Sequence, residues 1–250
     1  MPTQELSGTT ALVTGASRGF GRAIAVALSS RGAHVAGVAR DQGLLEELRA
    51  QLGDTFTPVA ADAADPVVAG HLLDKHLPRT LVLNAGAAPL PRPIHRQTWQ
   101  TFSRNWEVDV QHVFNWTREA LLLPLPPGSA VIAISSGAAV NGSPLSGGYA
   151  GAKATIQFIA SYAADESARN GLGIRFTSVL PQLTPETGLG AAGVAAYAAR
   201  QGVGIPAFLD RLGPVLTPEQ VGTAIIDIVT GSADDRDAYL LTATGLSPVQ

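Results

Sequence analysis

The chain has 250 residues, of which 46% are hydrophobic, so it can bury a substantial core in one large domain or two small ones. Its formal net charge is −3, charged residues make up 15%, and no basic block occurs, which argues against nucleic acid or an anionic membrane as a partner. The absence of cysteine excludes disulfides, thiolate nucleophiles and Cys-ligated metals, so redox chemistry must come from a bound cofactor. A small-molecule ligand is therefore expected.

The amino-terminal residues 1–7 lack the charged-then-apolar pattern of a signal peptide. No apolar run approaches the roughly 18 residues that span a bilayer. These features predict a soluble, cytoplasmic protein without a membrane partner. The five histidines show no metal-ligand spacing, so no metal site is expected.

Short apolar runs alternate along the chain with longer segments of helical period. The expected strands are Thr10 to Thr14, His34 to Ala39, Phe56 to Ala60, Thr80 to Leu83, Ala130 to Ser135, Ile174 to Leu180 and Ala238 to Thr242. The expected helices lie near Gly21 to Ser30, Leu44 to Leu52, Val67 to His76, Thr98 to Leu123, Tyr149 to Ala168 and Pro218 to Thr230. This alternation predicts an α/β fold with a parallel sheet covered by helices on both faces. We expect one domain over residues 1–250, with an irregular lid at Gln182 to Pro214.

A glycine-rich turn follows the first expected strand and opens directly into a helical pattern. Glycines let a backbone turn tightly and approach a pyrophosphate, whose charge is met by free N–H groups at the start of the helix. An ordinary strand-to-helix turn is the alternative, and the flanking strand and helix favour the ligand-binding interpretation. The candidate cofactor-binding residues here are Gly15, Ser17, Arg18, Gly19, Phe20 and Gly21.

The Gly-x-x-x-Gly-x-Gly spacing resembles the short-chain dehydrogenase/reductase family, and the resemblance extends over most of the chain. It implies a Rossmann-type, doubly wound, mostly parallel sheet of seven strands that binds a nicotinamide cofactor. By resemblance, the other cofactor-binding positions are Asp62 near the adenine, Asn84, Ala85 and Gly86 after the fourth strand, and Pro181 after the sixth. Leu83 replaces the first Asn of the family's Asn-Asn-Ala-Gly, and Gln182 replaces the Gly that usually follows the Pro.

Ser136 follows the fifth expected strand, and Tyr149 and Lys153 form a Tyr-x-x-x-Lys pattern on the next helix. Residues i and i+4 share one helix face, so the ammonium lies beside the phenol and favours its ionised form. The resemblance implies that Tyr149 transfers the proton, that Ser136 holds the substrate oxygen, and that Lys153 also holds the nicotinamide ribose. A Tyr-x-x-x-Lys pair alone is usually a surface pair. Its combination with the glycine turn favours catalysis.

Asp109 takes the place of an Asn whose main-chain carbonyl, in the family, holds a water that links the Lys to solvent. Asp keeps that carbonyl, so we include Asp109 among the catalytic candidates. Its carboxylate near Lys153 would favour the charged ammonium and slow proton passage. Asn115 lies too far along the helix to substitute for the missing Asn.

The residues after the second strand predict which nicotinamide binds. An acid there favours NAD, because it binds the ribose hydroxyls and repels the extra phosphate of NADP. Here Ala39 occupies that place and Arg40 follows, while Arg18 lies in the glycine turn. Two guanidiniums near one phosphate outweigh Asp41, so NADP(H) is predicted ahead of NAD(H).

Together these features predict an NADP(H)-dependent carbonyl reductase or alcohol dehydrogenase. Apolar residues in the expected pocket walls favour a neutral or hydrophobic ketone, aldehyde or secondary alcohol; the walls are Ala87 to Leu90, Gly137 to Gly148 and the lid. Two alternatives stay open: a catalytically weak NADP-binding regulatory protein, and an epimerase or dehydratase, which would normally need a larger substrate region. The resemblance also implies a homo-oligomer, a tetramer or dimer, formed through the two long helices.

Overall fold

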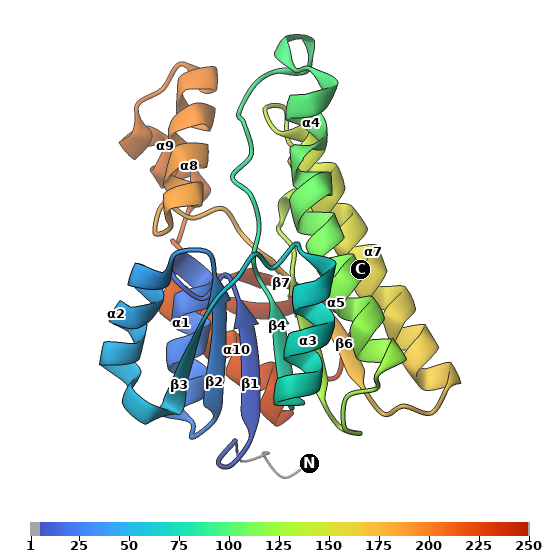
Figure 1. The fold of residues 1–250 in the computed structure, drawn as a ribbon. Coiled ribbons are helices and arrows are strands. Elements are labelled where there is room, and N and C mark those ends of the chain that lie inside the picture. Colours follow the sequence, from blue (N-terminus) through green and yellow to red (C-terminus); the bar gives the residue numbers. More distant parts are fainter. Residues whose placement is uncertain (1–5, 250) are drawn as a thin grey trace.

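One mixed sheet organises the protein, as seen in the computed structural model, which describes residues 6–249 (Figure 1). The expectation that residues 1–7 carry no signal peptide falls mostly on residues 1–5, which lie outside the described residues. The strands are β1 (Thr10–Thr14), β2 (His34–Ala39), β3 (Phe56–Ala60), β4 (Thr80–Leu83), β5 (Ala130–Ile134), β6 (Arg175–Pro181), β7 (Ala238–Thr242) and β8 (Gly245–Pro248). Their order is β3-β2-β1-β4-β5-β6-β7-β8, and every neighbouring pair is parallel except β7 with β8. The predicted fold class is confirmed.

Helices cover both faces of the sheet. They are α1 (Gly19–Ser30), α2 (Gln42–Leu52), α3 (Pro66–His76), α4 (Trp99–Asn105), α5 (Gln111–Leu122), α6 (Ala138–Asn141), α7 (Gly147–Arg169), α8 (Gly188–Gln201), α9 (Ile205–Leu212) and α10 (Pro218–Thr230). One core cluster joins the sheet to α1, α2 and α10, and a second joins it to α3, α5 and α7. Strands β1, β4 and β5 are buried almost throughout, because they are covered on both faces.

Local capping explains where several helices begin. The Asp41 and Asp65 carboxylates accept backbone N–H groups at the starts of α2 and α3. Thr217 begins α10 with a capping box, Pro218 follows at the first helical position, and Gly231 ends the helix in a left-handed conformation. Short-range chemistry therefore fixes these boundaries.

Three sequence expectations need correction. The sheet has eight described strands rather than seven, because the chain turns after Thr242 and returns antiparallel as β8. The segment Gln182 to Pro214 is not irregular, since it contains α8 and α9, which pack on each other around Phe208. The helix expected from Thr98 to Leu123 is interrupted between α4 and α5 by a π-helical segment, Trp106–Val110.

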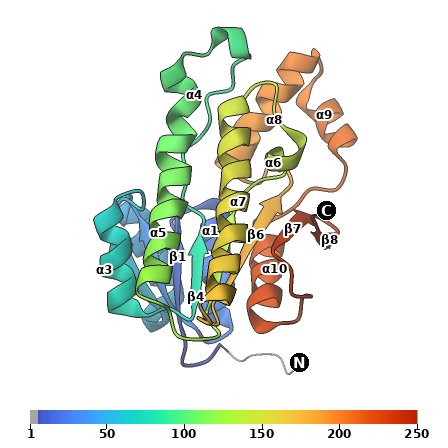
Figure 2. The same cartoon turned by 90° about the vertical axis from the view of Figure 1, so that its right-hand side faces the viewer.

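The carboxyl ends of the parallel strands meet at one edge of the sheet. Above this edge rise α4 and the α8–α9 pair, and Figure 2 shows α6 and the first turns of α7 between them. The strand order reverses between β1 and β4, and open α/β sheets bind ligands at the carboxyl ends beside such a switch point. No helix within residues 6–249 is both long and apolar enough to cross a bilayer.

Candidate functional site

The glycine turn between β1 and α1 depends on three glycines that let the backbone bend and approach itself. Gly15 and Gly19 have φ values of +68° and +55°, a region that side chains disfavour. A Cβ on Gly21 would lie 2.2 Å from the Gly15 carbonyl oxygen, so only glycine fits there. The glycines thus hold the turn tightly against the start of α1.

Asn84 braces this turn from the end of β4. Its side-chain nitrogen donates to the carbonyl oxygens of Thr14 and Gly15, at 3.1 and 3.3 Å. The Thr14 hydroxyl in turn accepts the backbone N–H groups of Asn84 and Ala85. Leu83, in place of the family's first Asn, is fully buried in the core.

No side chain caps the amino terminus of α1 at Arg18. Its first N–H groups are therefore available to an external acceptor, and the helix dipole favours an anion there. Thr187, the cap of α8, lies so near that a Cβ on Gly19 would be 3.6 Å from its methyl group. Sequence reasoning missed Thr187, although a Thr beginning a helical segment is a recognisable cap signal.

Arg18 and Arg40 are exposed and belong to neighbouring loops. Backbone hydrogen bonds from Gly15 and Ala16 to the Val38 carbonyl hold these two loops together. In the described part of the chain, neither guanidinium has a hydrogen-bond or ion-pair partner. Both cations are therefore free to contact a ligand phosphate.

The acids near this surface are engaged with backbone. Asp41 accepts the Leu44 N–H as the cap of α2, and Asp62, after β3, accepts the Ala64 N–H at 3.0 Å. Ser17 and Phe20 are half-buried in the glycine turn. Pro181 ends β6, and its carbonyl accepts the Gly137 N–H at 2.9 Å, which joins the end of β6 to the segment after Ser136.

Ser136 lies just past the end of β5, and Tyr149 and Lys153 lie beside each other on α7, which is joined to this end of the strand. The Lys153 ammonium lies 5.6 Å from the centre of the Tyr149 ring and donates to the Ile134 carbonyl at 3.2 Å. The Ser135 hydroxyl donates to the Lys153 carbonyl at 2.7 Å and fastens α7 to β5. The Ser136 oxygen accepts the Ala138 N–H, so its own hydrogen is available to a ligand.

Asp109 also reaches this group from the π-helical segment. Its carboxylate lies 3.3 Å from the Lys153 ammonium, and both side chains are almost fully buried. Burial by itself would lower the pKa of Lys153, but the Asp109 carboxylate and Tyr149 outweigh it and raise that pKa above its ordinary value. A Cβ on Gly86 would lie 2.9 Å from Asp109, so the loop after β4 presses directly on the carboxylate.

Sequence reasoning missed two buried residues beside this pair. Asn105 donates to the Ala87 carbonyl at 2.7 Å and lies 3.5 Å from both Asp109 oxygens. His112 is fully buried, and neither ring nitrogen has a partner in hydrogen-bonding geometry among the described residues. Burial, together with the Lys153 charge, lowers the pKa of His112 to about 3, although the Ala85 backbone opposes the shift. Their spacing of about one helical turn from Asp109 is the signal that could have found them.

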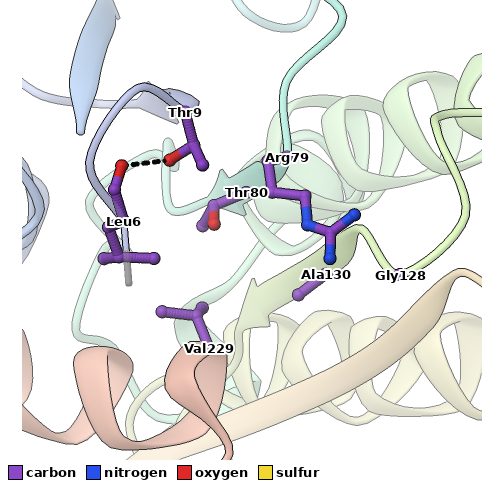
Figure 3. Close-up of a pocket in the computed structure, with 7 residues that line it drawn as sticks. All are labelled: Leu6, Thr9, Arg79, Thr80, Gly128, Ala130 and Val229. Carbon is purple, nitrogen blue, oxygen red and sulfur yellow. Dashed lines mark hydrogen bonds between the residues drawn. The ribbon is translucent and has the colours of Figure 1, made fainter. Parts of the chain in front are cut away.

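Two cavities lie away from these residues. A cavity of about 270 Å³, shown in Figure 3, is lined by Leu6, Thr9, Arg79, Thr80, Gly128, Ala130 and Val229. Because Thr80 and Ala130 begin their strands, it lies at the opposite, amino-terminal edge of the sheet. A more open hollow of about 420 Å³ lies along α4 and α5 between Trp99 and Phe114.

Comparisons with known proteins identify the family. A family model described as short chain dehydrogenase matches residues 9–197. A probable NADP-dependent dehydrogenase of Haemophilus influenzae is 34% identical over 190 residues, covering 70% of this chain and 71% of the relative. The L-xylulose reductase of Mesocricetus auratus is 35% identical over 108 residues, covering 43% of this chain and 44% of the relative.

A solved structure shares the fold at low sequence identity. The 3-ketoacyl-(acyl-carrier-protein) reductase from Brucella melitensis, complexed with NADH, has a TM-score of 0.79 at 24% identity and covers 95% of this chain and 97% of its own. The family model extends from β1 into α8 and therefore includes the glycine turn, Ser136, Tyr149 and Lys153. This chain belongs to the short-chain dehydrogenase/reductase family of oxidoreductases.

Proposed function

We propose that the protein transfers a hydride between NADP(H) and a neutral or hydrophobic ketone, aldehyde or secondary alcohol. The observation that carries this proposal is the buried Lys153 ammonium beside the Tyr149 ring at the carboxyl edge of the sheet. A fixed cation beside a phenol suits a residue that gives a proton to the substrate and takes it back. Ser136 stands at the same edge with a hydroxyl hydrogen to donate.

In this mechanism Tyr149 donates its proton to the substrate oxygen during reduction and accepts it during oxidation. Ser136 donates a hydrogen bond to the same oxygen and holds it in line. Lys153, whose ammonium lies beside the Tyr149 ring, would hold the nicotinamide ribose. When bound, the nicotinamide supplies or accepts the hydride.

The described residues fit a dinucleotide phosphate. The uncapped start of α1 and the glycine turn would hold the diphosphate, because no side chain caps this end of the helix. Arg40 and Arg18 would hold the 2′-phosphate of NADP, while Asp62 would lie near the adenine. The name of the Haemophilus relative supports NADP. The Brucella structure, which holds NADH, makes NAD the alternative to test.

We further propose that α8 and α9 form a lid over the substrate within a single domain. Gln182 donates to the Pro214 carbonyl at 2.7 Å and Thr184 to that of Leu216 at 2.6 Å, so the two ends of this segment are joined. The Tyr197 hydroxyl hydrogen-bonds to Ser143, in the loop before α7. The lid thus closes on the segment that precedes Tyr149.

The proposed assembly is a homo-oligomer formed through α4, α5 and α7. Trp99 on α4 is 77% exposed and Phe158 on α7 is 68% exposed, which is costly for large apolar side chains in water. Phe114 and Tyr162 add to the same faces. Sedimentation at micromolar concentration tests this, because a monomer would contradict it.

The function is tested by offering a panel of ketones and alcohols with NADPH or NADP and following the absorbance of the reduced nicotinamide. Activity in wild type and its loss in Tyr149→Phe would support the proposal. Turnover that is equal in both proteins would contradict it. Cofactor binding without turnover of any compound would favour a regulatory NADP-binding protein, for which the Asp109–Lys153 ion pair is the specific observation.

A further inference from the structure

The backbone of Ala87, in the loop after β4, is held at both its polar groups by side chains from the α4 region. Its N–H donates to Asp109 Oδ1 at 2.7 Å, and its carbonyl accepts from Asn105 Nδ2 at 2.7 Å. A carboxylate can only accept hydrogen bonds, whereas an amide can accept and donate. An amide at position 109 would carry both an acceptor and a donor, but here the two roles are divided between Asp109 and Asn105.

The division has an electrostatic consequence. Asp109 Oδ1 is taken by Ala87, and Oδ2 faces the Lys153 ammonium at 3.3 Å. Asn105 Nδ2 lies 3.5 Å from each of these oxygens. Asn105 is 3% exposed and Asp109 1%, so solvent cannot replace the amide. A buried ion pair is favourable only when hydrogen bonds satisfy its remaining lone pairs, and here the Ala87 N–H supplies a short one and Asn105 two longer ones.

Among the described residues that face Lys153, Asp109 supplies the negative charge with which the ammonium pairs. From α5, His112 is neutral near physiological pH because burial lowers its pKa to about 3. From α7, the groups are Tyr149 and Lys153 itself. Glu107, on the same π-helical segment, is exposed and accepts the Ser103 hydroxyl.

We propose that Asn105 is a positioning residue that acts through Asp109 on Lys153, and that the Asn105–Asp109 pair jointly replaces a single amide at position 109. This inference rests on the proposed function of Tyr149 and Lys153. Asn105 anchors both the Ala87 carbonyl and the Asp109 carboxylate. Without it, Asp109 is balanced by Lys153 alone and draws the ammonium away from the Tyr149 phenol.

The decisive experiment compares Asn105→Ala in two backgrounds. In the wild-type background, kcat should fall about tenfold or more with a smaller change in KM, because a buried carbonyl loses its donor and Lys153 is displaced. In the Asp109→Asn background the same change should cost less than about threefold, because the introduced amide both donates to and accepts from Ala87. Asn115→Ala is the matched control, since Asn115, on α5 rather than α4, also donates to a backbone carbonyl, that of Ala64.

A second readout needs no turnover. The ultraviolet absorbance of each protein is titrated against pH, and the titration of the same protein with Tyr149→Phe is subtracted. The difference reports the ionisation of Tyr149 alone. Asp109→Asn should move this ionisation to lower pH, because it leaves the Lys153 charge unbalanced, and Asn105→Ala should move it to higher pH. In the Asp109→Asn background, Asn105→Ala should leave it unchanged.

Equal effects of Asn105→Ala in both backgrounds, in kcat and in the titration, would overturn the inference. If Asn105→Ala does not fold, Asn105→Asp replaces it, and the exchanged pair Asn105→Asp with Asp109→Asn must then restore folding, or the inference is wrong. Failure of the proposed function is distinguishable, because Tyr149→Phe would then keep full turnover whatever the Asn105 variants do.

Discussion

The glycine turn after β1 and the Lys153 site beside β5 lie at the same edge of the sheet, but the charges of the first are exposed and those of the second are buried. At the turn, the start of α1 has no side-chain cap and the cations Arg18 and Arg40 are exposed. Beside β5, the Lys153 ammonium is buried against the Asp109 carboxylate. Exposed charges can be changed with little effect on folding, whereas each member of a buried pair supports the fold as well as the chemistry.

The largest effect should follow from breaking the buried pair. Lys153→Met leaves the Asp109 carboxylate buried without a counter-ion, which typically costs about 3–5 kcal/mol of unfolding free energy. Turnover and cofactor affinity should fall as well. Urea unfolding and cofactor titration measure these effects. The double variant with Asp109→Asn is the control and should regain most of the stability; a single variant destabilised by less than about 1 kcal/mol would contradict the pairing.

His112 extends the comparison to acid stability. Its pKa is lowered to about 3 by burial and by the Lys153 charge. Between pH 6.5 and pH 3, His112 is therefore protonated in the unfolded chain but stays neutral in the folded protein. Stability from this group is therefore present above pH 6.5 and is lost as pH falls toward 3, by about 1.4 kcal/mol per unit.

His112→Phe keeps a buried ring beside Trp116 and removes the titrating group. The variant should lose about 3 kcal/mol less than wild type between pH 6.5 and 4. Urea unfolding at both pH values measures the difference. His95→Phe, which removes an exposed histidine, is the control. Parallel curves for wild type and His112→Phe would show that His112 is not held neutral.

Tyr149→Phe tests the chemistry without disturbing the buried pair. Removal of the transferable proton should lower turnover by roughly two decades or more, with cofactor binding nearly unchanged. Rates are measured where chemistry limits turnover, and binding by titration. Tyr162→Phe, on an exposed face of α7, is the control. Loss of cofactor affinity together with turnover would point instead to a binding role.

The smallest effect is expected from changing the exposed arginines beside the glycine turn. Arg40→Ala should weaken NADP by about ten- to a hundredfold, because a charge-assisted hydrogen bond contributes about 1.5–3 kcal/mol, while NAD should be nearly unaffected. Arg18 can retain part of the phosphate binding and keep the loss near tenfold. Adding Ala39→Asp should reverse the preference, since the acid repels the phosphate. Titrations of both cofactors at fixed ionic strength test this, and equal weakening of both would contradict the assignment.

The amino-acid sequence by itself determined the elements whose signals are local. Strand β1 and helix α10 begin and end where predicted, because apolar runs, a Thr cap, a following Pro and a closing Gly act over a few residues. The sequence also indicates that the glycine turn and the Tyr-x-x-x-Lys helix lie at the same edge of the sheet, because each motif follows the carboxyl end of a parallel strand. Local patterns were weaker in the segment Gln182 to Pro214, where Gly- and Ala-rich sequence concealed α8.

The tertiary structure decided how the charges pair. The family resemblance predicted that the Asp109 carboxylate lies near Lys153, but local periodicity predicted a continuous helix over Thr98 to Leu123. In the structure Asp109 lies on a π-helical segment and pairs with Lys153, which comes from a helix 44 positions further along the chain. Asn105 gains its partner only because the loop after β4 passes beside it. Periodicity reports which side chains are buried, whereas the pairing of buried charges depends on distant segments packing together.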